Sequence, residues 1–413
     1  MSVRRLLAVS WDMPPMSGPR AVQVSRLLKH LVPLGWESTV ICFGPRSTRY
    51  HNDPELAIRL RSPGVRLVHV PSLEERLPFR ALWRIAPPLK YLPDEKRVWI
   101  GAAARAALRA VRADRFDAIV SFAQPWSDHL VGSRLQRATG LPWVAHFSDP
   151  WVDSPYGPRR AWQRRVWQRM EASVVKRADA LVFVNRQTAD RVMEKYPDAW
   201  RTKAHVVPHG FEAGDVPRPL RASAIEAPLH IVHTGRFYDG TRTPLALLGA
   251  LASLSHQRPL ARELRVTFVG PIVPAYRRAA TALGLDGIVE FAARVPAAEA
   301  ARRAAEADVL LVVDAPAVQN LFLPSKLVDY LPFDKPILAL TPANGATADL
   351  VRDLAYPTAP PDDEAAIAAT VAALLEGRRD GTLQASAQHR HVAARYDIRR
   401  AAAAFAEVLA QCA

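Results

Sequence analysis

The stretch RLLAVSWDMPPMSGPRAVQVSRLLKHLVPLGWESTVICF, residues 5–43, contains a complete strand, loop, helix and strand. RLLAVS (5–10) and STVICF (38–43) are apolar runs of strand length. Between them, the loop PPMSG leads into a helical segment that Gly35 is expected to end. One face of this helix carries Val22, Leu27, Leu28 and Leu31. Strands joined through a helix pair in parallel within one sheet, so this stretch predicts an α/β fold.

The same alternation of apolar strands and helical segments continues through the chain. In the first half the runs are RLLAVS (5–10), STVICF (38–43), VRLVHV (65–70), AIVSFA (118–123), PWVAHF (142–147) and ALVFVN (180–185). In the second half they are LHIVHTG (229–235), LRVTFVG (264–270), GIVEFAARV (287–295), DVLLVVD (308–314) and KPILALT (335–341). Near-continuous apolar strands are typical of parallel sheets covered on both faces. The sequence therefore predicts two doubly wound, Rossmann-like α/β domains.

The boundary between the domains is expected where this periodicity stops. Residues 205–230 are rich in Pro, Gly and short polar residues. We expect an N-terminal domain over 1–210, a linker over 211–228, a second domain over 229–395 and a final helix over 396–413. Asp397 is the expected N-cap of that Ala-rich helix, which could pack on either domain. Ligands of such folds bind at the carboxyl ends of the strands, so a cleft between the two domains is the expected site.

The composition limits the classes of protein that fit. A chain of 413 residues with 49% hydrophobic and 23% charged residues can build two globular cores. Its only cysteines, Cys42 and Cys412, exclude a disulfide framework and a zinc cluster built on cysteine. The apolar run before Asp12 is too short for a signal-peptide core, and no window of about 18 uncharged apolar residues occurs. We therefore expect a cytoplasmic protein.

The positive charge is concentrated in the first half of the chain. Residues 1–215 contain 34 of the 55 Lys and Arg residues and 20 of the 40 Asp and Glu residues, which leaves 21 against 20 for the second half. Such asymmetry indicates an anionic partner, such as acidic lipid headgroups, a phosphorylated substrate or nucleic acid. The alternative is an Arg-rich surface without a partner, since only 8 of the basic residues are Lys.

The segment LHIVHTGRFYDGTRTP, residues 229–244, indicates phosphate binding. Gly235 ends the strand and permits a close approach of backbone to ligand, while the guanidinium of Arg236 can hold two phosphate oxygens. Arg242 is a second cation in the same loop. Pairing of Arg236 with a carboxylate is the alternative. The GxGxxG fingerprint and the GxxxxGK[ST] phosphate loop are absent, which removes the main support for a dehydrogenase or an NTPase.

A second constellation lies in NLFLPSKLVDYLPFDKPILALT, residues 320–341. Pro324 at a first helical position, Ser325 and Lys326 predict a helix start with positive character, which suits an anion. Asp329 follows about one turn later, where its carboxylate can accept hydrogen bonds from ribose hydroxyls. The alternative is an ordinary capped helix whose charged side chains are solvated or paired.

A third constellation lies in WVAHFSDPWVDSPY, residues 143–156. His146, Asp149 and Asp153 follow or end a buried strand, at the edge expected to face ligand. A structural histidine is the alternative for His146. No HExxH or similar ligand spacing occurs, so we expect no bound metal.

Residues 72–112 combine aromatic and basic side chains. They include Phe79, Trp83, Tyr91 and Trp99 together with Arg80, Arg84, Lys90, Arg97 and Arg105. This mixture suits the headgroup layer of a membrane, where rings lie at the interface and cations meet anionic lipid. Packing of the rings in the core is an equally good interpretation. A peripheral position on the inner face of the cytoplasmic membrane is thus one possibility.

At these residues the chain resembles a known family, the retaining, nucleotide-sugar-dependent glycosyltransferases of family four, which have the GT-B fold. The resemblance extends over nearly the whole chain and depends on the order and spacing of several motifs. They are PPMSGPRA (14–21), ADALVFVNRQTAD (178–190), VVPHGF (206–211), HTGRFYDG (233–240) and LPSKLVDYLPFDKPILA (323–339).

The resemblance implies that the second domain binds the nucleotide sugar and the first binds the acceptor. It gives Arg236 a role at the diphosphate and Asp329 a role at the ribose, where the family usually has Glu. The family's Lys shortly after the Arg is missing, so Arg242 or Lys326 must replace it. The family's sugar-contacting Glu is Leu321 here, which shifts that contact to backbone amides or to neighbours such as Gln319 and Asn320. The candidate donor-binding residues are Gly18, Gly235, Arg236, Arg242, Arg294, Gln319, Asn320, Leu321, Ser325, Lys326 and Asp329.

The catalytic candidates are His146, Asp149 and Arg236. In a retaining enzyme the resemblance implies attack on the face that the nucleotide leaves, with the departing phosphate helping to take the proton. Asp149 or His146 would orient or deprotonate the acceptor hydroxyl. The expected function is transfer of a sugar from a nucleoside diphosphate to a glycan or lipid-linked acceptor in polysaccharide or glycolipid assembly, without a further cofactor. The alternatives are a sugar-nucleotide epimerase with the GT-B fold and a basic nucleic-acid-binding protein, although no nucleic-acid motif occurs.

Overall fold

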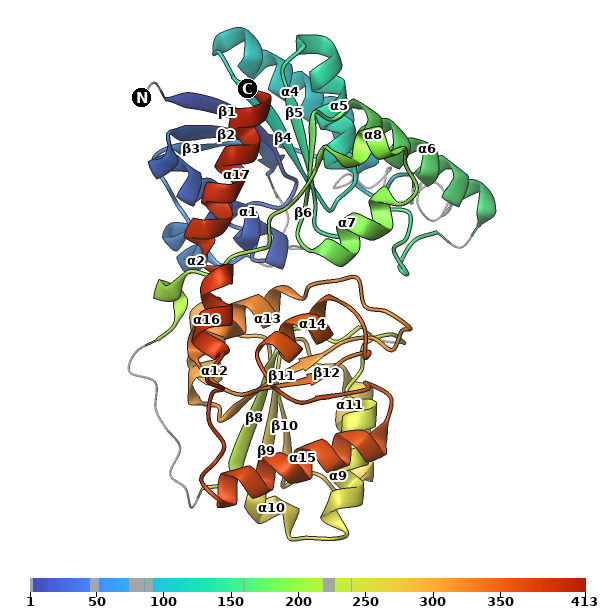
Figure 1. Ribbon diagram of the computed structural model, residues 1–413, viewed down its shortest axis with the longest axis vertical. Helices are drawn as coiled ribbons and strands as arrows, with labels where there is room; N and C mark the ends of the chain where they lie inside the picture. Colours follow the sequence, from blue (N-terminus) through green and yellow to red (C-terminus); the bar gives the residue numbers. More distant parts are fainter. Residues whose placement is uncertain are drawn as a thin grey trace. The chain divides into compact units, whose positions relative to one another are not determined.

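The computed structural model describes residues 3–44, 52–73, 85, 92–158, 160–217, 227–238 and 240–413. The chain divides into two compact units (Figure 1). The first unit comprises Met1–Gly210 and Ile398–Ala413, and the second comprises Phe211–Asp397. The last helix of the chain therefore belongs to the same unit as its first strand.

The first unit is built on a parallel sheet of seven strands in the order β3-β2-β1-β4-β5-β6-β7. The strands are β1 Arg4–Val9, β2 Trp36–Phe43, β3 Val65–Val70, β4 Ala118–Ala123, β5 Trp143–Phe147, β6 Ala180–Phe183 and β7 Ala204–Val206. Six of them coincide with the predicted runs. The sequence did not predict β7, because a strand of three residues has too few side chains to show a period. The strand order reverses between β1 and β4. In sheets of this kind, ligands bind beside such a reversal, at the carboxyl ends of the strands.

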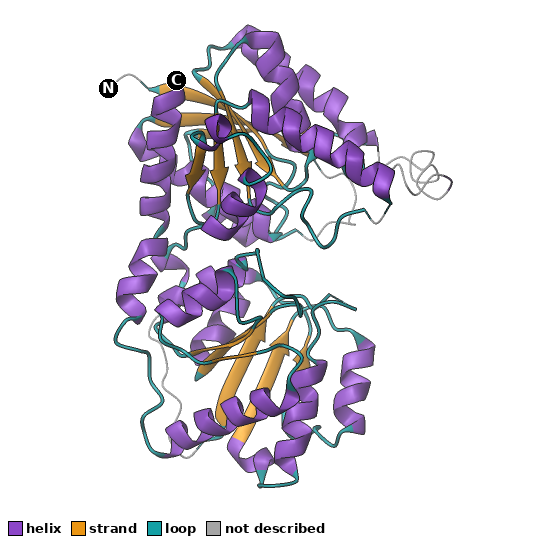
Figure 2. Cartoon of the chain, turned by 45° about the vertical axis from the view of Figure 1, so that its right-hand side comes forward, coloured by secondary structure: helices purple, strands orange, loops and turns teal. Residues whose placement is uncertain are grey.

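Helices cover both faces of this sheet, as Figure 2 shows. Along β1, Leu7 and Val9 face a core shared with α4, α5, α6 and α7, whereas Leu6 and Ala8 face one shared with α1 and α17. This alternation explains why the strands are apolar at every position. The helices are α1 Pro19–Leu31, α2 Pro54–Arg59, α4 Ile100–Ala113, α5 Ser127–Thr139, α6 Ala161–Arg177, α7 Arg186–Met193, α8 Asp198–Arg201 and α17 Ile398–Cys412, with short 3-10 turns at Val32–Leu34 and Arg97–Trp99.

The C-terminal helix α17 completes the core of the first unit. It lies beside α1 (Figure 1). The ring of Phe405 stacks on that of Phe122 from β4 with centroids 6.2 Å apart. The chain approaches itself closely where it re-enters this unit, because a Cβ on Gly210 would lie 2.4 Å from Cα of Ile398. Glycine at position 210 therefore permits the contact that seats the helix.

The second unit contains a parallel sheet of six strands in the order β10-β9-β8-β11-β12-β13. The strands are β8 Leu229–Thr234, β9 Leu264–Val269, β10 Val289–Ala292, β11 Val309–Val313, β12 Ile337–Leu340 and β13 Thr358–Ala359. The two-residue strand β13 was not predicted. The helices are α9 Leu245–Ser255, α10 Leu260–Glu263, α11 Pro274–Ala282, α12 Ala297–Glu306, α13 Ser325–Tyr330, α14 Ala346–Asp353, α15 Glu364–Arg379 and α16 His389–Ala393, with 3-10 turns at Ala213–Asp215, Leu331–Phe333 and Ala394–Tyr396.

The start of the expected linker packs within the second unit. Phe211 and Val216 are buried in the core that contains α13 and α14. The backbone amide of Phe211 also donates a hydrogen bond to the carbonyl of Tyr396, across 2.9 Å. Two apolar side chains spaced among Gly and Pro were too few to indicate this packing in the sequence.

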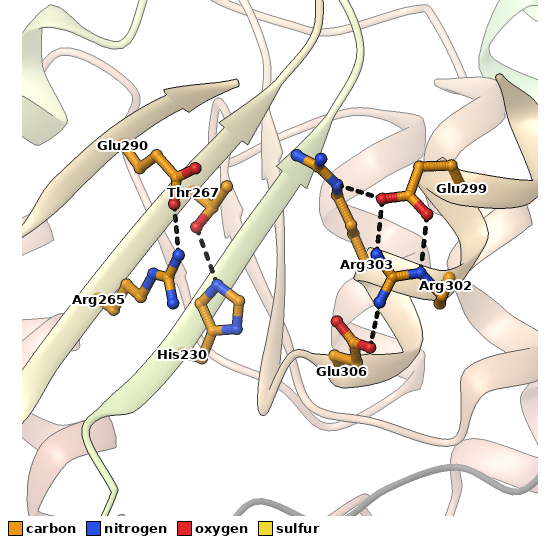
Figure 3. Close-up of polar contacts among 8 residues, drawn as sticks. All are labelled: His230, Arg265, Thr267, Glu290, Glu299, Arg302, Arg303 and Glu306. Carbon is orange, nitrogen blue, oxygen red and sulfur yellow. Dashed lines mark hydrogen bonds and ion pairs between the residues drawn. The ribbon is translucent and has the colours of Figure 1, made fainter. Parts of the chain in front are cut away.

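Polar pairs join the amino halves of the strands in the second unit (Figure 3). His230 of β8 contacts the hydroxyl of Thr267 on β9 at 2.9 Å, and Arg265 binds Glu290 on β10 at 2.5 Å. On α12, Arg302 lies between Glu299 and Glu306. The first two contacts join neighbouring strands, whereas those of Arg302 lie within α12.

Candidate functional site

In the second unit, the strand order reverses between β8 and β11, which places the loops that follow them on either side of a switch point. Thr234, Gly235 and Arg236 continue from β8, and Asp314 directly follows β11. The carboxyl edge of this sheet therefore gathers the residues of the first two predicted constellations.

The ammonium group of Lys326 lies against the backbone of Gly235. Its φ of +130° is a conformation that other residues rarely adopt, and a Cβ there would lie 2.8 Å from Nζ of Lys326. The backbone amide of Gly235 donates to the carbonyl of Val269 at 2.8 Å, which fixes the turn against β9. Lys326 can thus reach the backbone at the end of β8 because this position lacks a side chain.

Lys326 is itself held by a buried histidine. Its Nζ lies 2.9 Å from Nε2 of His233, one of the last residues of β8. Burial, together with the charge of Arg242, lowers the pKa of Lys326 to about 7, against the opposing charge of Asp314. Arg242 packs over the ring of Tyr238 at 5.2 Å, and its charge acts on Lys326, which lies over Gly235.

Asp314 anchors the loop between β11 and α13. Its Oδ2 accepts hydrogen bonds from Nδ2 of Asn320 at 2.6 Å and from the hydroxyl of Thr341 at 2.8 Å. Burial raises the pKa of Asp314, while the charge of Arg242 lowers it. Within the described part of the chain, Oδ1 of Asp314 and Nε of Arg242 are buried without a hydrogen-bond partner. The charge of Arg242 thus acts on the buried side chain of Asp314 within this site.

The side chain of Asn320 is fully engaged within the protein. Besides Asp314, its Nδ2 reaches the hydroxyl of Thr347 at 3.1 Å, and its Oδ1 accepts from the amide of Phe322 at 3.0 Å. This predicted sugar contact therefore shapes the loop. Among the other predicted residues, Gln319, Arg236 and Arg294 are exposed and Leu321 is half-buried.

Helix α13 differs in detail from the prediction. It has six residues and begins at Ser325, with Pro324 preceding it rather than occupying its first helical position. The hydroxyl of Tyr330 accepts a hydrogen bond of 2.8 Å from the amide of Thr234, which ties α13 to the end of β8. Lys326 and Asp329 are both half-buried on this short helix.

The first unit has a polar cluster at its own switch point. The buried guanidinium of Arg20, in the first turn of α1, donates through Nη2 to the carbonyl of Ala123 and to the hydroxyl of Ser148. Asp149, after β5, accepts from Nε2 of Gln124 at 3.0 Å and from the Ser148 hydroxyl at 3.2 Å. Predicted Gly18 caps the same helix, and a Cβ there would meet open space.

Further charges surround Arg20. Burial lowers its pKa to about 10, against the opposing influence of Asp149, Asp12 and Asp128. Burial raises the pKa of Asp128 well above its ordinary value, although Oδ2 accepts a hydrogen bond of 2.8 Å from the amide of Trp11. Lys96 lies over the Trp11 ring at 4.7 Å. The cluster is rich in carboxylates, which are suited to binding hydroxyl groups.

His146 lies within the electrostatic influence of Arg20 in this polar cluster, whereas Asp153 pairs with other charges. His146 is buried, with its ring against Phe122 and Phe405, and burial lowers its pKa well below the ordinary value. The side chain of Asp153 pairs with Lys195 and with Arg191. The carboxylate of Asp153 is thus neutralised by its neighbours, while the ring of His146 lies among rings that include His209, with centroids 6.0 Å apart.

Part of the aromatic and basic segment at 72–112 lies outside the described residues, including Phe79, Arg80, Trp83, Arg84, Lys90 and Tyr91. Trp99 is buried, and its indole donates to the carbonyl of Val70 at 3.1 Å. Arg97 and Arg105 are exposed. The interpretation as core packing is thus correct for Trp99.

Sequence reasoning missed Arg20, His233 and Asp314. Asp314 was detectable, because a carboxylate directly at the end of a buried strand requires a reason. His233 lies inside an apolar strand, and only the packing shows that its ring faces Lys326. Across the described ranges, no group of three or more His, Cys, Asp or Glu side chains is arranged to hold a metal. None of the helices in these ranges has the length and apolar character needed to cross a membrane.

Comparison with known proteins extends these observations. Residues 20–210 match the model of the glycosyl transferase 4-like domain. No curated protein matches the sequence. Sucrose-phosphate synthase from Thermosynechococcus elongatus is similar in structure with a TM-score of 0.72 and 16% identity, over 99% of this chain and 98% of that one.

Two further solved structures are similar over the full length. The HepE protein of Anabaena, solved with UDP, has a TM-score of 0.68 and 15% identity, with 99% of this chain and 100% of that one covered. A glycosyltransferase from Rickettsia africae has a TM-score of 0.68 and 12% identity, with 100% and 99% covered. In sequence, residues 20–210 thus resemble a glycosyl transferase 4-like domain, and the chain has the GT-B fold of glycosyltransferases.

Proposed function

We propose that this protein is a retaining glycosyltransferase that moves a sugar from a nucleoside diphosphate to the hydroxyl of a glycan or lipid-linked acceptor. The observation that carries the proposal is the position of Lys326 over Gly235 at the switch point of the second unit. Arg236 directly follows Gly235 in the chain, and the charge of Arg242 acts on Lys326. Cations on an exposed glycine turn suit a diphosphate, which bears adjacent negative charges.

In this proposal the second unit binds the donor. Arg236 and Lys326 hold the diphosphate, and Arg242 balances the charge of Asp314 while adding to the positive potential. Asp329 accepts hydrogen bonds from the ribose, and Ser325 at the start of α13 contacts the phosphate. The HepE structure with UDP supports a nucleotide ligand for this fold.

The first unit binds the acceptor at the cluster of Arg20, Gln124 and Asp149. Asp149 orients the acceptor hydroxyl, and Gln124 and Ser148 fix the direction of its carboxylate. The acceptor oxygen forms a bond to the anomeric carbon on the face from which the diphosphate departs. The broken bond leaves its electron pair on the diphosphate, whose oxygen takes the hydroxyl proton. Fixed cations stabilise the developing charge without a metal.

A membrane-associated acceptor is the setting we propose, since the excess positive charge lies in residues 1–215. Replacing Arg80, Arg84 and Lys90, which lie outside the described residues, should weaken sedimentation with anionic vesicles. Nucleotide affinity should persist in the same variant. Vesicle binding equal to that of the wild type would argue against this surface.

The test of the function is calorimetric titration with UDP, GDP and ADP, followed by their sugar conjugates. Binding of one base should identify the donor, and transfer to a glycan or lipid-linked acceptor should then conserve the anomeric configuration in the product by NMR. Absence of binding to every nucleotide would refute the proposal. Conversion of the nucleotide sugar without an acceptor would indicate the epimerase, and salt-sensitive binding of nucleic acid alone would indicate the third alternative.

A further inference from the structure

His233 is a fully buried histidine inside β8 whose protonation pattern is fixed by its neighbours. Its Nδ1 lies 3.0 Å from the carbonyl of Leu311 on β11. A carbonyl only accepts hydrogen bonds, so Nδ1 carries the proton and donates, and Nε2 of the neutral ring is left as an acceptor. The ring is held in place by stacking on Phe237, with centroids 4.7 Å apart and planes within 10°.

The acceptor nitrogen of this ring faces Lys326. The distance of 2.9 Å between Nε2 and Nζ allows the lysine to donate to the ring. The same Nζ lies over Gly235, where a Cβ would come within 2.8 Å of it. His233 therefore determines where the lysine side chain ends, directly above the turn that follows β8.

Charged and titratable groups from three parts of the unit act on Lys326. His233 faces it from β8, Arg242 acts from the loop after β8, and Asp314 acts from the end of β11. Asp329 and Tyr330 are the other titratable residues of its own helix α13. Burial and the Lys326 charge lower the pKa of His233 well below its ordinary value, which keeps the ring neutral.

These surroundings disfavour a charge on Lys326 in the free protein. Burial has the largest effect and Arg242 adds to it, against Asp314, so that the pKa of Lys326 falls to about 7. A bound diphosphate would place negative charge beside Nζ and favour the protonated form. The ligand and the proton would then bind together.

We propose that Lys326 takes up one proton from solvent when a nucleoside diphosphate binds, and that His233 is the positioning residue that presents Lys326 over Gly235. This inference rests on the proposed function, in which the turn after β8 holds the diphosphate. It makes affinity for the donor decrease as the pH rises above neutrality, while no covalent bond changes. The release of the diphosphate product would return the proton.

The test is titration calorimetry of the full chain with a nucleoside diphosphate at pH 8, in Tris and in HEPES. These buffers differ in ionisation enthalpy, so the difference in binding heat gives the number of protons taken up. With a pKa of about 7, the free lysine is roughly 10% protonated at pH 8, so an uptake of about 0.9 proton is expected. The diphosphate itself is fully ionised at this pH.

Lys326→Arg is the matched variant, because arginine stays protonated at this pH. It should bind the nucleoside diphosphate with little proton uptake and with a flatter dependence of affinity on pH. Lys335→Arg is the control, since Lys335 lies before β12 and donates to the carbonyls of Ala305 and Ala307. Burial also lowers the pKa of Lys335, yet its replacement should leave proton uptake as in the wild type.

Two variants of His233 separate positioning from packing. His233→Asn can retain the hydrogen bond to Leu311, but its shorter side chain places no acceptor at the position of Nε2. His233→Gln provides an acceptor near the position of Nε2. The Asn variant should bind the diphosphate about tenfold more weakly at pH 8, as expected for one lost hydrogen bond. The Gln variant should recover part of that loss, and thermal unfolding should confirm that both are folded.

The outcomes distinguish this inference from the function on which it rests. Diphosphate binding without proton uptake in the wild type, or with equal uptake in Lys326→Arg, would overturn the inference and leave the donor site standing. Equal losses of affinity in the two folded His233 variants would remove the positioning role. Failure of the wild type to bind any nucleoside diphosphate would overturn both the inference and the proposed function.

Discussion

Nδ2 of Asn320 donates a hydrogen bond of 2.6 Å to Oδ2 of Asp314, so the residue that directly follows β11 holds the loop that leads into α13. The backbone of Asn320 is fixed as well, since its carbonyl accepts from the amide of Ala346 at 2.9 Å. Lys326 and Asp329 follow directly on α13. Their positions therefore depend on a buried carboxylate that the ligand need not touch.

Asp314→Ala should weaken both the fold of the second unit and nucleotide binding. It leaves the donors of Asn320 and Thr341 without their acceptor, which costs about 1–3 kcal/mol of the free energy of unfolding. Urea unfolding and calorimetry measure the two effects. Asp308→Ala is the control, because Asp308 lies before the same strand and accepts from the amide of His230. It should reduce stability alone, and an equal loss of affinity in both variants would contradict a specific role of Asp314.

Arg236→Ala should remove charge-assisted hydrogen bonds to the diphosphate. The loss of about 1.5–3 kcal/mol corresponds to a decrease of roughly 10- to 150-fold in kcat/KM. Because the side chain is exposed, thermal unfolding should change little. Arg265→Ala offers a matched control, since Arg265 is exposed at the other edge of the sheet and pairs with Glu290. Turnover near that of the wild type would remove Arg236 from the diphosphate.

Asp149→Asn should slow transfer to the acceptor while nucleotide affinity stays unchanged, because Asp149 belongs to the first unit. Loss of an orienting carboxylate is expected to lower the rate by about 100-fold. Kinetics with varied acceptor and a separate titration with nucleotide measure the two quantities. The control is Asp153→Asn, which disrupts pairs with Lys195 and Arg191 and should reduce stability rather than transfer. A large change in nucleotide affinity in Asp149→Asn would place the residue elsewhere in the mechanism.

Phe405→Ala should destabilise the first unit by about 3–5 kcal/mol, because it leaves a cavity against Phe122 where α17 covers the sheet. Chemical denaturation followed by tryptophan fluorescence measures this loss. Glu407 lies on the exposed side of the same helix, and Glu407→Ala should change stability by less than about 0.5 kcal/mol. Similar effects of the two substitutions would mean that α17 does not seal the core.

His129 makes stability depend on pH. Burial, assisted by the charge of Arg20, lowers its pKa to about 3 in the folded chain, against about 6.5 when unfolded. Between these values the unfolded chain binds a proton that the folded chain does not. The free energy of unfolding therefore falls as the pH drops through this window, by up to about 1.4 kcal/mol per pH unit from this residue.

His129→Asn isolates that contribution, because asparagine can retain the contact of 2.8 Å between Nδ1 and the hydroxyl of Ser121 without titrating. Urea unfolding at pH 7, 6 and 5 gives the free energy of unfolding of wild type and variant. The contributions of other titrating groups cancel in the difference between the two proteins. The stability of the wild type should fall more steeply toward low pH. Parallel curves would show that His129 does not bind a proton on unfolding.

The sequence alone determined the α/β class, the two doubly wound sheets and most of their strands. It did so because strands buried on both faces are apolar at every position, as Leu6 and Leu7 illustrate by facing opposite cores. It also singled out Gly235, Arg236 and Lys326, since the ends of parallel strands meet at one edge of a sheet. Contacts local to a strand end can be inferred from residue types.

Only the tertiary structure decided which of these side chains meet. The stacking of Phe405 on Phe122 assigned the last helix to the first unit, because an apolar helix face carries no information about its partner. The fold also packed the ring of His146 against that of Phe405 and placed Asp149 where it accepts a hydrogen bond from Gln124. Likewise, His233 looked like one more residue of an apolar strand. Its contact with Lys326, 93 positions along the chain, exists only because β8 and α13 are packed together, and spacing in the sequence does not encode such proximity.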